Sequence, residues 1–333
     1  MRIAVFSAQP YDKQFLEQEN SQHGYELSYF DQQLNEANAE LCKGFDAVCA
    51  FVNDDLSAPV LNRLKAHRVQ FIAMRCAGFN NVDLVAAKSL ELPVVRVPAY
   101  SPEAVAEHTL ALILTLNRKT HRAYNRVRES NFTLNGLLGF NLHGKTVGLI
   151  GTGQIGLATA RILNGFGCKL IAYDPYPNPE YVSLGGHYVE LEQLYSRSDI
   201  ITLHCPLNEG SYHLIDETSI SLMKEGVMII NTSRGGLVDT KALIAGLKNR
   251  KIQALGLDVY EQESQLFFHD HSGKIIDDEL FERLQSFPNV LITGHQGFFT
   301  EEALTQIAAI TLNNLACLAG DQPCENELTH AIS

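Results

Sequence analysis

The sequence predicts an α/β protein built from two doubly wound parallel sheets, one in each of two domains. Residues 1–99 alternate short apolar segments with helical ones, a pattern typical of a parallel sheet with helices on both faces. Residues 145–174 run from a strand through a glycine-rich turn and a helix to a second strand. The chain of 333 residues also exceeds the ~250–300 residues at which a single hydrophobic core stops growing.

The first domain is expected to hold strands near residues 3–7, 26–30, 47–52, 70–74 and 94–97, with helices near 12–23, 36–43, 58–67 and 83–90. The segment VPAYSP at 97–102 interrupts this alternation, and Ser101-Pro102 has the residue types of a helix start. We expect a long helix from Glu103 to about Glu129, buried over its apolar first half and solvated over its basic second half. The chain therefore crosses between domains near residue 100.

The glycine-rich turn in 145–174 has the G-x-G-x-x-G pattern of dinucleotide-binding proteins, formed by Gly151, Gly153 and Gly156. Its glycines allow a tight turn, close approach of a pyrophosphate, and close packing of helix on strand. The helix that follows offers free N–H groups to the phosphates. Asp174 ends the second strand, where a carboxylate accepts the adenosine ribose hydroxyls and repels a 2′-phosphate. The pattern therefore indicates NAD rather than NADP.

Further strands are expected at 200–203, 227–231, 254–257 and 290–293, with helices between them. The last helix, from Glu301 to about Ala319, has the spacing of a packed helix and could return to the first domain. Residues 261–278 lack clear periodicity, and a loop of that length is often functional.

Composition excludes several classes of function. The net charge of −12 argues against a nucleic-acid partner and favours a small-molecule one. The N-terminus lacks the pattern of a signal peptide, and no apolar run is long enough to span a membrane. The seven cysteines are scattered without a C-x-x-C pair, which suggests reduced thiols in the cytoplasm. His269 and His271 lack a further ligand at metal spacing, so no metal site is expected.

Three reactive side chains follow strands of the second domain, where ligands of open α/β sheets bind. Hydride transfer to a carbonyl needs a proton donor, a group that keeps the donor protonated, and a cation that orients the substrate. Histidine suits the first role, a carboxylate the second, and the planar guanidinium of arginine the third. We therefore assign His295 as acid/base, Glu263 as its partner and Arg234 as the clamp for the substrate carboxylate. Each alone could be an ordinary turn or surface residue, and the assignment depends on their joint occurrence beside a dinucleotide site.

Several motifs are spread along the chain: RCAGFNNVD at 75–83, VPAYSPEAVAEHTL at 97–110, GTGQIG at 151–156, HCPL at 204–207, NTSRGGLVD at 231–239, GLDVYEQE at 256–263 and TGHQGFF at 293–299. Together they resemble the D-isomer-specific 2-hydroxyacid dehydrogenase family, and within it the fermentative D-lactate dehydrogenases of bacteria. The resemblance covers nearly the whole chain. It implies the same catalytic set of Arg234, Glu263 and His295.

The resemblance also implies binding residues. The substrate carboxylate is expected at the backbone of Ala77 and Gly78 with Tyr100 nearby, beside Arg234 and His295. The cofactor contacts that it implies, besides the three glycines, are Gln154, Ile155, Asp174, Cys205, Pro206, Thr232, Ser233, Arg234 and Asp258. The family folds as a Rossmann-type NAD domain, here 100–299, and a flavodoxin-like substrate domain, here 1–99 plus 300–333, with a cleft between them.

The resulting prediction is an NAD-dependent D-lactate dehydrogenase of the cytoplasm that reduces pyruvate to D-lactate. Relatives are dimers or tetramers, so a homodimer or homotetramer is expected. An aromatic pocket of Phe79, Tyr100, Phe298 and Phe299 would suit a methyl ketoacid, although these rings could equally belong to the core. Two alternatives stay open: a relative that uses a longer 2-ketoacid, and a binding protein that senses the dinucleotide.

Overall fold

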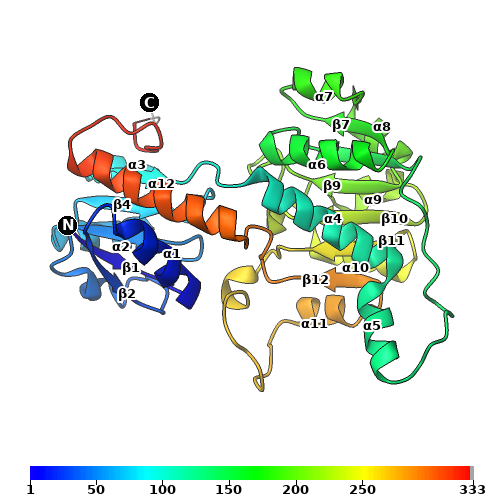
Figure 1. The fold of residues 1–333 in the computed structure, drawn as a ribbon, viewed down its shortest axis with the longest axis horizontal. Coiled ribbons are helices and arrows are strands. Elements are labelled where there is room, and N and C mark those ends of the chain that lie inside the picture. The colour runs from blue at the N-terminus through cyan, green and yellow to red at the C-terminus, as the bar shows by residue number, and fades with distance from the viewer. Residues whose placement is uncertain (331–333) are drawn as a thin grey trace. The chain divides into compact units, whose positions relative to one another are not determined.

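The computed structural model describes residues 1–330, so the last three residues of the predicted first domain lie outside it. The chain divides into two compact units. Unit 1 comprises Met1–Ser101 and the segment that starts at Phe299, and unit 2 comprises Pro102–Phe298. Each unit has its own parallel sheet flanked by helices (Figure 1), which confirms the predicted fold class.

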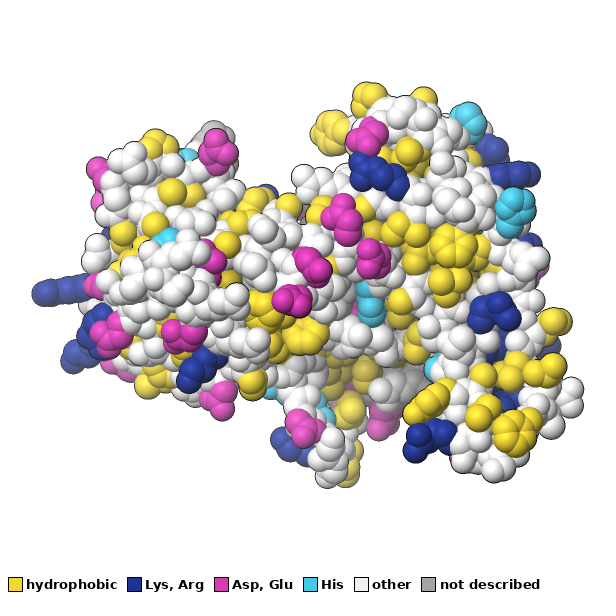
Figure 2. Space-filling model, in the orientation of Figure 1, with side chains coloured by type: hydrophobic (Ala, Val, Ile, Leu, Met, Phe, Trp, Pro, Cys, Tyr) yellow, Lys and Arg dark blue, Asp and Glu magenta, His cyan; other side chains and the backbone are white. Residues whose placement is uncertain are grey.

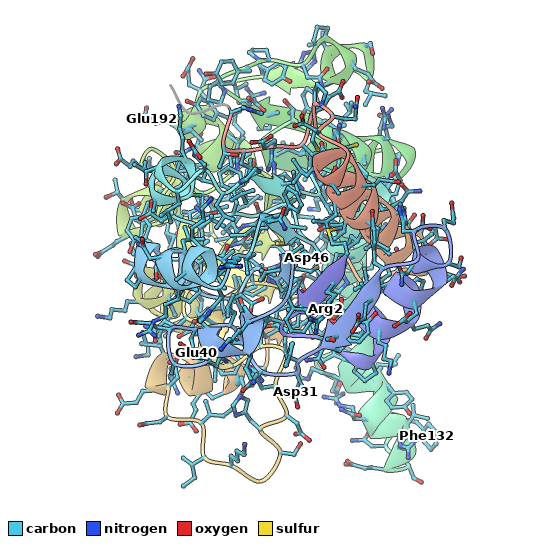
Figure 3. The ribbon with its side chains drawn as sticks, turned by 90° about the vertical axis from the view of Figure 1, so that its left-hand side faces the viewer. Arg2, Asp31, Glu40, Asp46, Phe132 and Glu192 are labelled. Atoms are coloured by element: carbon cyan, nitrogen blue, oxygen red, sulfur yellow. The ribbon has the colours of Figure 1, made fainter. Side chains whose placement is uncertain are left out.

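Unit 1 contains a five-stranded parallel sheet in the order β2-β1-β3-β4-β5. Its strands are β1 (Arg2–Val5), β2 (Glu26–Tyr29), β3 (Ala47–Ala50), β4 (Phe71–Met74) and β5 (Val94–Arg96). Its helices are α1 (Pro10–Asn20), the 3-10 helix η1 (Ala39–Cys42), α2 (Ala58–Ala66), α3 (Leu84–Ser89) and α12 (Glu301–Ala319). The start of β1 is fixed to the start of β3 by the Arg2 amide, which donates to the Asp46 carboxylate at 2.7 Å (Figure 3).

The helix α12 packs in unit 1 although it follows unit 2 in the sequence. Its Ala308, Leu312 and Leu315 are buried in one cluster with Ile3 and Val5 of β1. Asn314 on the same helix donates to the Arg96 carbonyl at 2.8 Å, at the end of β5. The return of the chain to the first sheet, which the apolar spacing of this helix suggested, is therefore observed.

Unit 2 contains a seven-stranded parallel sheet in the order β12-β11-β10-β9-β6-β7-β8. Its strands are β6 (Thr146–Ile150), β7 (Lys169–Tyr173), β8 (His187–Tyr188), β9 (Ile200–Leu203), β10 (Val227–Asn231), β11 (Ile252–Leu257) and β12 (Val290–Ile292). Its helices are α4 (Pro102–Arg118), α5 (Thr120–Arg128), α6 (Gln154–Gly165), α7 (Pro179–Ser183), α8 (Leu191–Arg197), α9 (Glu217–Leu222), α10 (Thr240–Lys248) and α11 (Glu279–Gln285), with the 3-10 helices η2 (Gly235–Leu237) and η3 (Glu263–Gln265).

Helices cover both faces of this sheet, which explains why its central strands are apolar throughout. Every residue of β10 is buried. Leu112 of α4 and Leu163 of α6 belong to a core cluster on one face. Leu194 of α8 and Leu243 of α10 belong to a second cluster on the other face. A strand buried on both faces reads as a continuous hydrophobic run, as VMIIN does here.

The structure corrects the expected long helix 103–129. The chain breaks at Lys119, which has a left-handed backbone with φ of 52°, and separates α4 from α5. A left-handed residue cannot continue an α-helix, so α5 leaves in a new direction. The predicted burial pattern holds nevertheless, because α4 is largely buried and no residue of α5 is. The expected helix 36–43 is likewise reduced to the single 3-10 turn η1.

Among the described residues 1–330, no helix combines the length and apolar character needed to cross a membrane.

Candidate active site

The glycine-rich turn between β6 and α6 has the geometry that a dinucleotide requires. Gly151 has φ of +97°, and a Cβ there would come within 2.7 Å of the His204 and Cys205 backbone. A Cβ at Gly156 would lie 2.2 Å from the Gly151 carbonyl oxygen, so helix and turn could not pack as closely. At Gly153, by contrast, no atom of residues 1–330 other than Gly153 and its chain neighbours lies within 4 Å of a would-be Cβ. This open backbone at the N-terminus of α6 fits a pyrophosphate.

Asp174, directly after β7, stabilises this turn as well as facing the space beside it. Its Oδ2 accepts hydrogen bonds from the Thr152 amide at 2.7 Å and the Thr152 hydroxyl at 3.0 Å. Its Oδ1 accepts one from the Tyr176 amide at 2.8 Å. The acid that the sequence assigns to the ribose hydroxyls is therefore pre-oriented by backbone donors.

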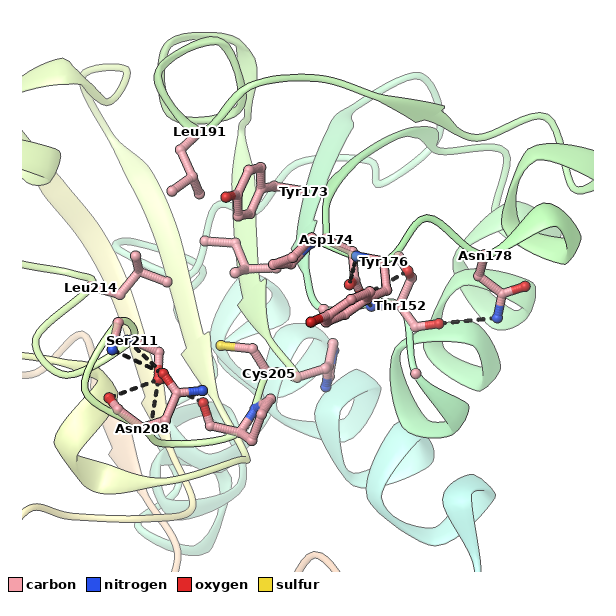
Figure 4. A pocket seen from close by; sticks show the side chains of 17 residues that line it. Thr152, Tyr173, Asp174, Tyr176, Asn178, Leu191, Cys205, Asn208, Ser211 and Leu214 are labelled. Atoms are coloured by element: carbon pink, nitrogen blue, oxygen red, sulfur yellow. Dashed lines mark hydrogen bonds between the residues drawn. The ribbon is translucent and has the colours of Figure 1, made fainter. Parts of the chain in front are cut away.

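A cavity of about 760 Å³ opens at the carboxyl ends of β6, β7 and β9 (Figure 4). Five of the predicted cofactor residues line it: Gly151, Gly153, Asp174, Cys205 and Pro206. The other seven, Gln154, Ile155, Gly156, Thr232, Ser233, Arg234 and Asp258, are not part of its lining. The cavity is large enough for part of a dinucleotide.

The sequence did not identify most of the wall opposite the glycine turn. Asn208, Gly210, Ser211 and Leu214 line the cavity from the loop after β9. The Asn208 side chain accepts from the Gly210 and Ser211 amides, and the Ser211 hydroxyl donates to the Pro206 carbonyl at 2.7 Å. The cluster Asn208-Glu209-Gly210-Ser211 marks a turn but not what it faces, so no sequence signal separated these residues from an ordinary loop.

Burial sets the protonation of two side chains on the cavity wall. Burial lowers the pKa of His204 to about 3, so its imidazole is neutral at physiological pH. The ring Nε2 lies 3.0 Å from the Thr202 hydroxyl, and Nδ1 is buried without a partner among residues 1–330. Burial also raises the pKa of the Cys205 thiol to about 11, with a contribution from the Asp174 charge. The thiol is therefore protonated and unreactive.

The strand order places the remaining predicted residues next to one another. β12, β11 and β10 are neighbours in register, with Leu257 paired to both Ile292 and Asn231. His295 follows β12, Asp258 follows β11 and Arg234 follows β10. Because all these strands are parallel, the three residues lie at the same edge of the sheet as the glycine turn.

His295 and Glu263 form a direct pair. The His295 Nδ1 lies 2.7 Å from Glu263 Oε1, and both side chains are less than a fifth exposed. The second carboxylate oxygen of Glu263 accepts from the Tyr260 amide at 2.9 Å. With the carboxylate on Nδ1, that nitrogen carries a proton, and Nε2 is the ring atom that exchanges a proton with a substrate. The imidazole is thus oriented and electrostatically supported for acid/base chemistry.

Asp258 holds the backbone that carries His295. Its carboxylate accepts from the Gln296 amide at 2.9 Å, the Gly297 amide at 2.8 Å and the Thr293 hydroxyl at 2.5 Å. Its carbonyl accepts from the His295 amide at 2.7 Å, and His295 has a left-handed backbone with φ of 54°. Burial by itself would raise the pKa of Asp258, but hydrogen bonds from His108 and Thr293 outweigh it and lower the pKa. The carboxylate is therefore ionised and fixes the unusual backbone of His295.

Arg234 lies half-buried on the turn between β10 and α10. Its Nη1 donates to the Ser233 carbonyl at 2.7 Å, and its own carbonyl accepts from the Asn231 side chain at 2.8 Å. Ser233 in turn donates to the Cys205 carbonyl at 2.7 Å, and the Thr232 hydroxyl lies 2.9 Å from that of Thr109. This segment is therefore joined both to the cavity wall and to α4.

The substrate residues suggested for unit 1 lie after β4 and β5. The Ala77 carbonyl accepts from the Arg96 guanidinium at 2.9 Å, and the Gly78 carbonyl accepts from the Cys76 thiol at 3.3 Å. Tyr100 is partly exposed near the end of the unit. The loop that carries the backbone amides of Ala77 and Gly78 is thus held in place by hydrogen bonds to its carbonyl groups.

The structure places no group of three His, Cys, Asp or Glu side chains within reach of one metal ion in residues 1–330.

Three comparisons with known proteins show what this chain is similar to. The D-lactate dehydrogenase of Escherichia coli is 56% identical over 328 residues, which cover 98% of this chain and 100% of that protein. The apo structure of D-lactate dehydrogenase from Escherichia coli has a TM-score of 0.90 at 55% identity, over 98% of this chain and 100% of that one. The structure of a D-lactate dehydrogenase from Aquifex aeolicus complexed with NAD and lactic acid has a TM-score of 0.88 at 33% identity, over 98% and 99%.

Residues 110–297 match the NAD binding domain of the D-isomer specific 2-hydroxyacid dehydrogenases. This match spans more than half of the chain and includes the glycine turn, Asp174, Arg234, Glu263 and His295. Together with the identity over the whole chain, it confirms the resemblance that the motifs indicated. The chain belongs to the D-isomer specific 2-hydroxyacid dehydrogenase family and is an oxidoreductase with NAD as its cofactor.

Proposed function

We propose that this protein is an NAD-dependent D-lactate dehydrogenase that reduces pyruvate with His295 as the proton donor. The observation that carries the proposal is the His295–Glu263 pair, 2.7 Å apart at the end of β12, on the sheet edge where Arg234 also lies. Identity of 56% to a D-lactate dehydrogenase favours lactate over a longer hydroxyacid, since a D-2-hydroxyisocaproate dehydrogenase of known structure is 33% identical.

In this proposal each catalytic residue has a separate task. NAD, when bound in its reduced form, supplies the hydride. The Arg234 guanidinium binds the substrate carboxylate and polarises the carbonyl. The protonated imidazole of His295 donates its Nε2 proton to the oxygen as negative charge develops there, and Glu263 stabilises the cation and holds the ring. Oxidation of D-lactate runs the same proton transfer in reverse, from the hydroxyl to neutral His295.

The binding roles belong to the same proposal. We assign the NAD contacts to residues 100–299 and the substrate amides of Ala77 and Gly78 to the domain 1–99 plus 300–333, with Tyr100 at the boundary between the two. The Gly151 turn and Asp174 would bind the pyrophosphate and the adenosine ribose. Their fit to a dinucleotide is supported by the open backbone at Gly153 and by the cavity beside Asp174.

A panel of 2-ketoacids with chiral analysis of the product tests the function. We expect rapid NADH oxidation with pyruvate, slower oxidation with branched or longer 2-ketoacids, and D-lactate as the only enantiomer. Preference for a branched ketoacid would move the assignment to that substrate within the family. Tight NADH binding without turnover of any 2-ketoacid would refute the enzyme and favour a dinucleotide sensor.

We further propose a cytoplasmic homodimer or homotetramer. Large apolar side chains are exposed along α5 and the segment after it, and Figure 2 shows hydrophobic side chains interspersed with Lys and Arg in this part of unit 2. They are Tyr124, Val127, Phe132, Leu134 and Leu138, each more than half exposed. An exposed apolar group of this kind favours a protein contact. Light scattering of the purified protein measures the oligomer, and a monomer would refute this part.

A further inference from the structure

A second histidine–glutamate pair lies beside the proposed catalytic one. The His213 Nε2 lies 2.7 Å from Glu261 Oε1, and both side chains are less than a third exposed. The other oxygen of Glu261 accepts from the amide of Thr240 at 2.9 Å and also from the Thr240 hydroxyl. We call these three residues the Glu261 junction. The catalytic roles proposed above use none of them.

The junction joins three segments, each of which carries a residue of the site. His213 lies between Ser211 and Leu214, which line the cofactor cavity. Thr240 is the first residue of α10, the helix that follows Arg234 and η2. Glu261 itself lies two positions before Glu263. One carboxylate therefore connects the cavity wall, the arginine segment and the glutamate segment.

Backbone contacts between the same segments are close and regular. The His213 amide donates to the Gly236 carbonyl at 2.9 Å, and the Ile215 amide donates to the Leu237 carbonyl at 3.0 Å. A Cβ at Gly235 would lie 2.1 Å from the carbonyl carbon of Tyr260, so the residue after Arg234 packs directly against the backbone beside Glu261. A change in this packing would displace two groups at once. One is Arg234, and the other is the Tyr260 amide that donates to Glu263.

The electrostatics and the backbone geometry give the junction a preferred arrangement. The Glu261 carboxylate binds the first amide of α10, where the helix dipole favours an anion. His213 has a left-handed backbone with φ of 50°, which is uncommon for a residue with a side chain. Such a conformation persists where surrounding contacts hold it, and the ring hydrogen bond to Glu261 is one of these contacts.

We infer that Glu261, held by His213 and Thr240, is a positioning residue that fixes Arg234 and Glu263 relative to the cofactor wall. This inference rests on the proposed roles of Arg234 and Glu263. Loss of the junction should displace the Arg234 guanidinium and weaken the hydrogen bond between Glu263 and His295. If Glu261 only stabilised the fold, its loss would lower the melting temperature without these effects. Misplacement of a catalytic group by a fraction of an ångström is enough to lower the rate strongly.

The test compares Glu261→Ala and His213→Ala with Glu225→Ala as a matched control. Glu225 also forms an ion pair in unit 2, with Lys251, but its side chain is 80% exposed. We expect Glu261→Ala to raise the KM for pyruvate about 10-fold and to lower kcat, with the control unchanged. The kcat/KM for pyruvate of the double variant should fall no further than that of Glu261→Ala alone, because both changes break the same junction.

NMR of the His295 ring gives a readout that needs no turnover. Glu263 contacts this ring by the hydrogen bond at Nδ1, and Asp258 acts on it through its field. If the junction positions Glu263, the resonance of the proton on His295 Nδ1 shifts in both junction variants. A lower melting temperature with unchanged pyruvate KM and an unchanged Nδ1 proton resonance would overturn the inference. If Glu261→Ala does not fold, His213→Ala decides alone, because it leaves the contact with α10 in place.

The same design separates this inference from the proposed function. If the wild-type protein binds NADH but does not turn over pyruvate, the proposed function fails. The NMR comparison would then still show whether the junction orients Glu263 on His295.

Discussion

Replacing Asp174 by asparagine should change cofactor preference, and the structure allows its effect to be separated from damage to the glycine turn. The carboxylate accepts three hydrogen bonds, from the Thr152 amide and hydroxyl and from the Tyr176 amide. Asp174→Ala would remove all of them and release the turn. Asp174→Asn keeps the shape and can keep an acceptor oxygen for Thr152, while its NH2 group replaces the acceptor of the Tyr176 amide. It therefore spares the contacts to the glycine turn, loses the Tyr176 contact, and removes the charge and the ribose hydrogen bonds.

The expected loss follows from the hydrogen bonds that an ionised carboxylate would make to the ribose. A hydrogen bond to a charged group contributes about 1.5–3 kcal/mol, so weakening one should raise the Kd for NADH about 10- to 100-fold. Binding of NADPH should not weaken in the same way, because the repulsion between carboxylate and 2′-phosphate is removed. The preference for NADH over NADPH should therefore fall by about 10-fold or more.

The assay measures kcat/KM for NADH and NADPH at saturating pyruvate, with Kd values from the quenching of protein fluorescence. Asp199→Asn is the matched control. Asp199 accepts the Thr146 amide at 2.8 Å, but it lies at the opposite, amino end of the same sheet. Its substitution should lower stability without changing the cofactor ratio. An unchanged NADH/NADPH ratio in Asp174→Asn would refute the assignment of Asp174 to the ribose.

Three further outcomes are expected. Arg234→Lys should lower kcat/KM for pyruvate by about 10²-fold or more, with NADH affinity retained, because lysine keeps the charge but cannot make the two-pronged contact. Wild-type pyruvate kinetics in this variant would exclude Arg234 as the clamp for the substrate carboxylate. His204 has a folded-state pKa of about 3, below its unfolded value of about 6.5, so its contribution to stability is present above pH 6.5 and is lost as pH falls. Between pH 6.5 and 5 this loss is about 1–2 kcal/mol, and urea unfolding of His204→Gln should show a correspondingly weaker acid dependence than wild type. Cys205, with a pKa of about 11, should react with iodoacetamide at pH 8 about 10²-fold more slowly than a free thiol, which peptide mass analysis would detect.

The elements that the sequence predicted well are those with a continuous apolar pattern. The bounds expected for the strands at 200–203 and 227–231, and for the helix 301–319, match those of β9, β10 and α12. The two-residue strand β8 went unidentified because it is too short to show alternation. The break at Lys119 was missed because the left-handed position holds lysine, whereas glycine or asparagine at that position would have marked it.

The site was predictable to the extent that strand ends determine it. His295, Glu263 and Arg234 were proposed because parallel strands bring their following residues to one edge, and the structure shows the contact between the first two. The cavity wall at Asn208–Ser211 and the Glu261 junction depend on how separate loops fold against one another, and no periodicity records that. Asp258 is buried, and both of its carboxylate oxygens accept hydrogen bonds from the protein. Only the structure could reveal this.

The central claim is that Glu263, hydrogen-bonded to Nδ1, orients His295 and stabilises its cation for proton transfer to the substrate. The measurement that tests it most directly is the pH dependence of kcat/KM for pyruvate in the wild type and Glu263→Gln, with Glu225→Gln as control. Reduction needs protonated His295, so it should hold at low pH and fall as pH rises, whereas oxidation of D-lactate should show the opposite limb.

Removing the carboxylate charge 2.7 Å from Nδ1 should move the alkaline limb for reduction to lower pH, and Glu263→Asp should move it less. An alkaline limb in Glu263→Gln that stays in place, or moves to higher pH, would contradict the coupling between Glu263 and His295 and with it the proposed proton donor.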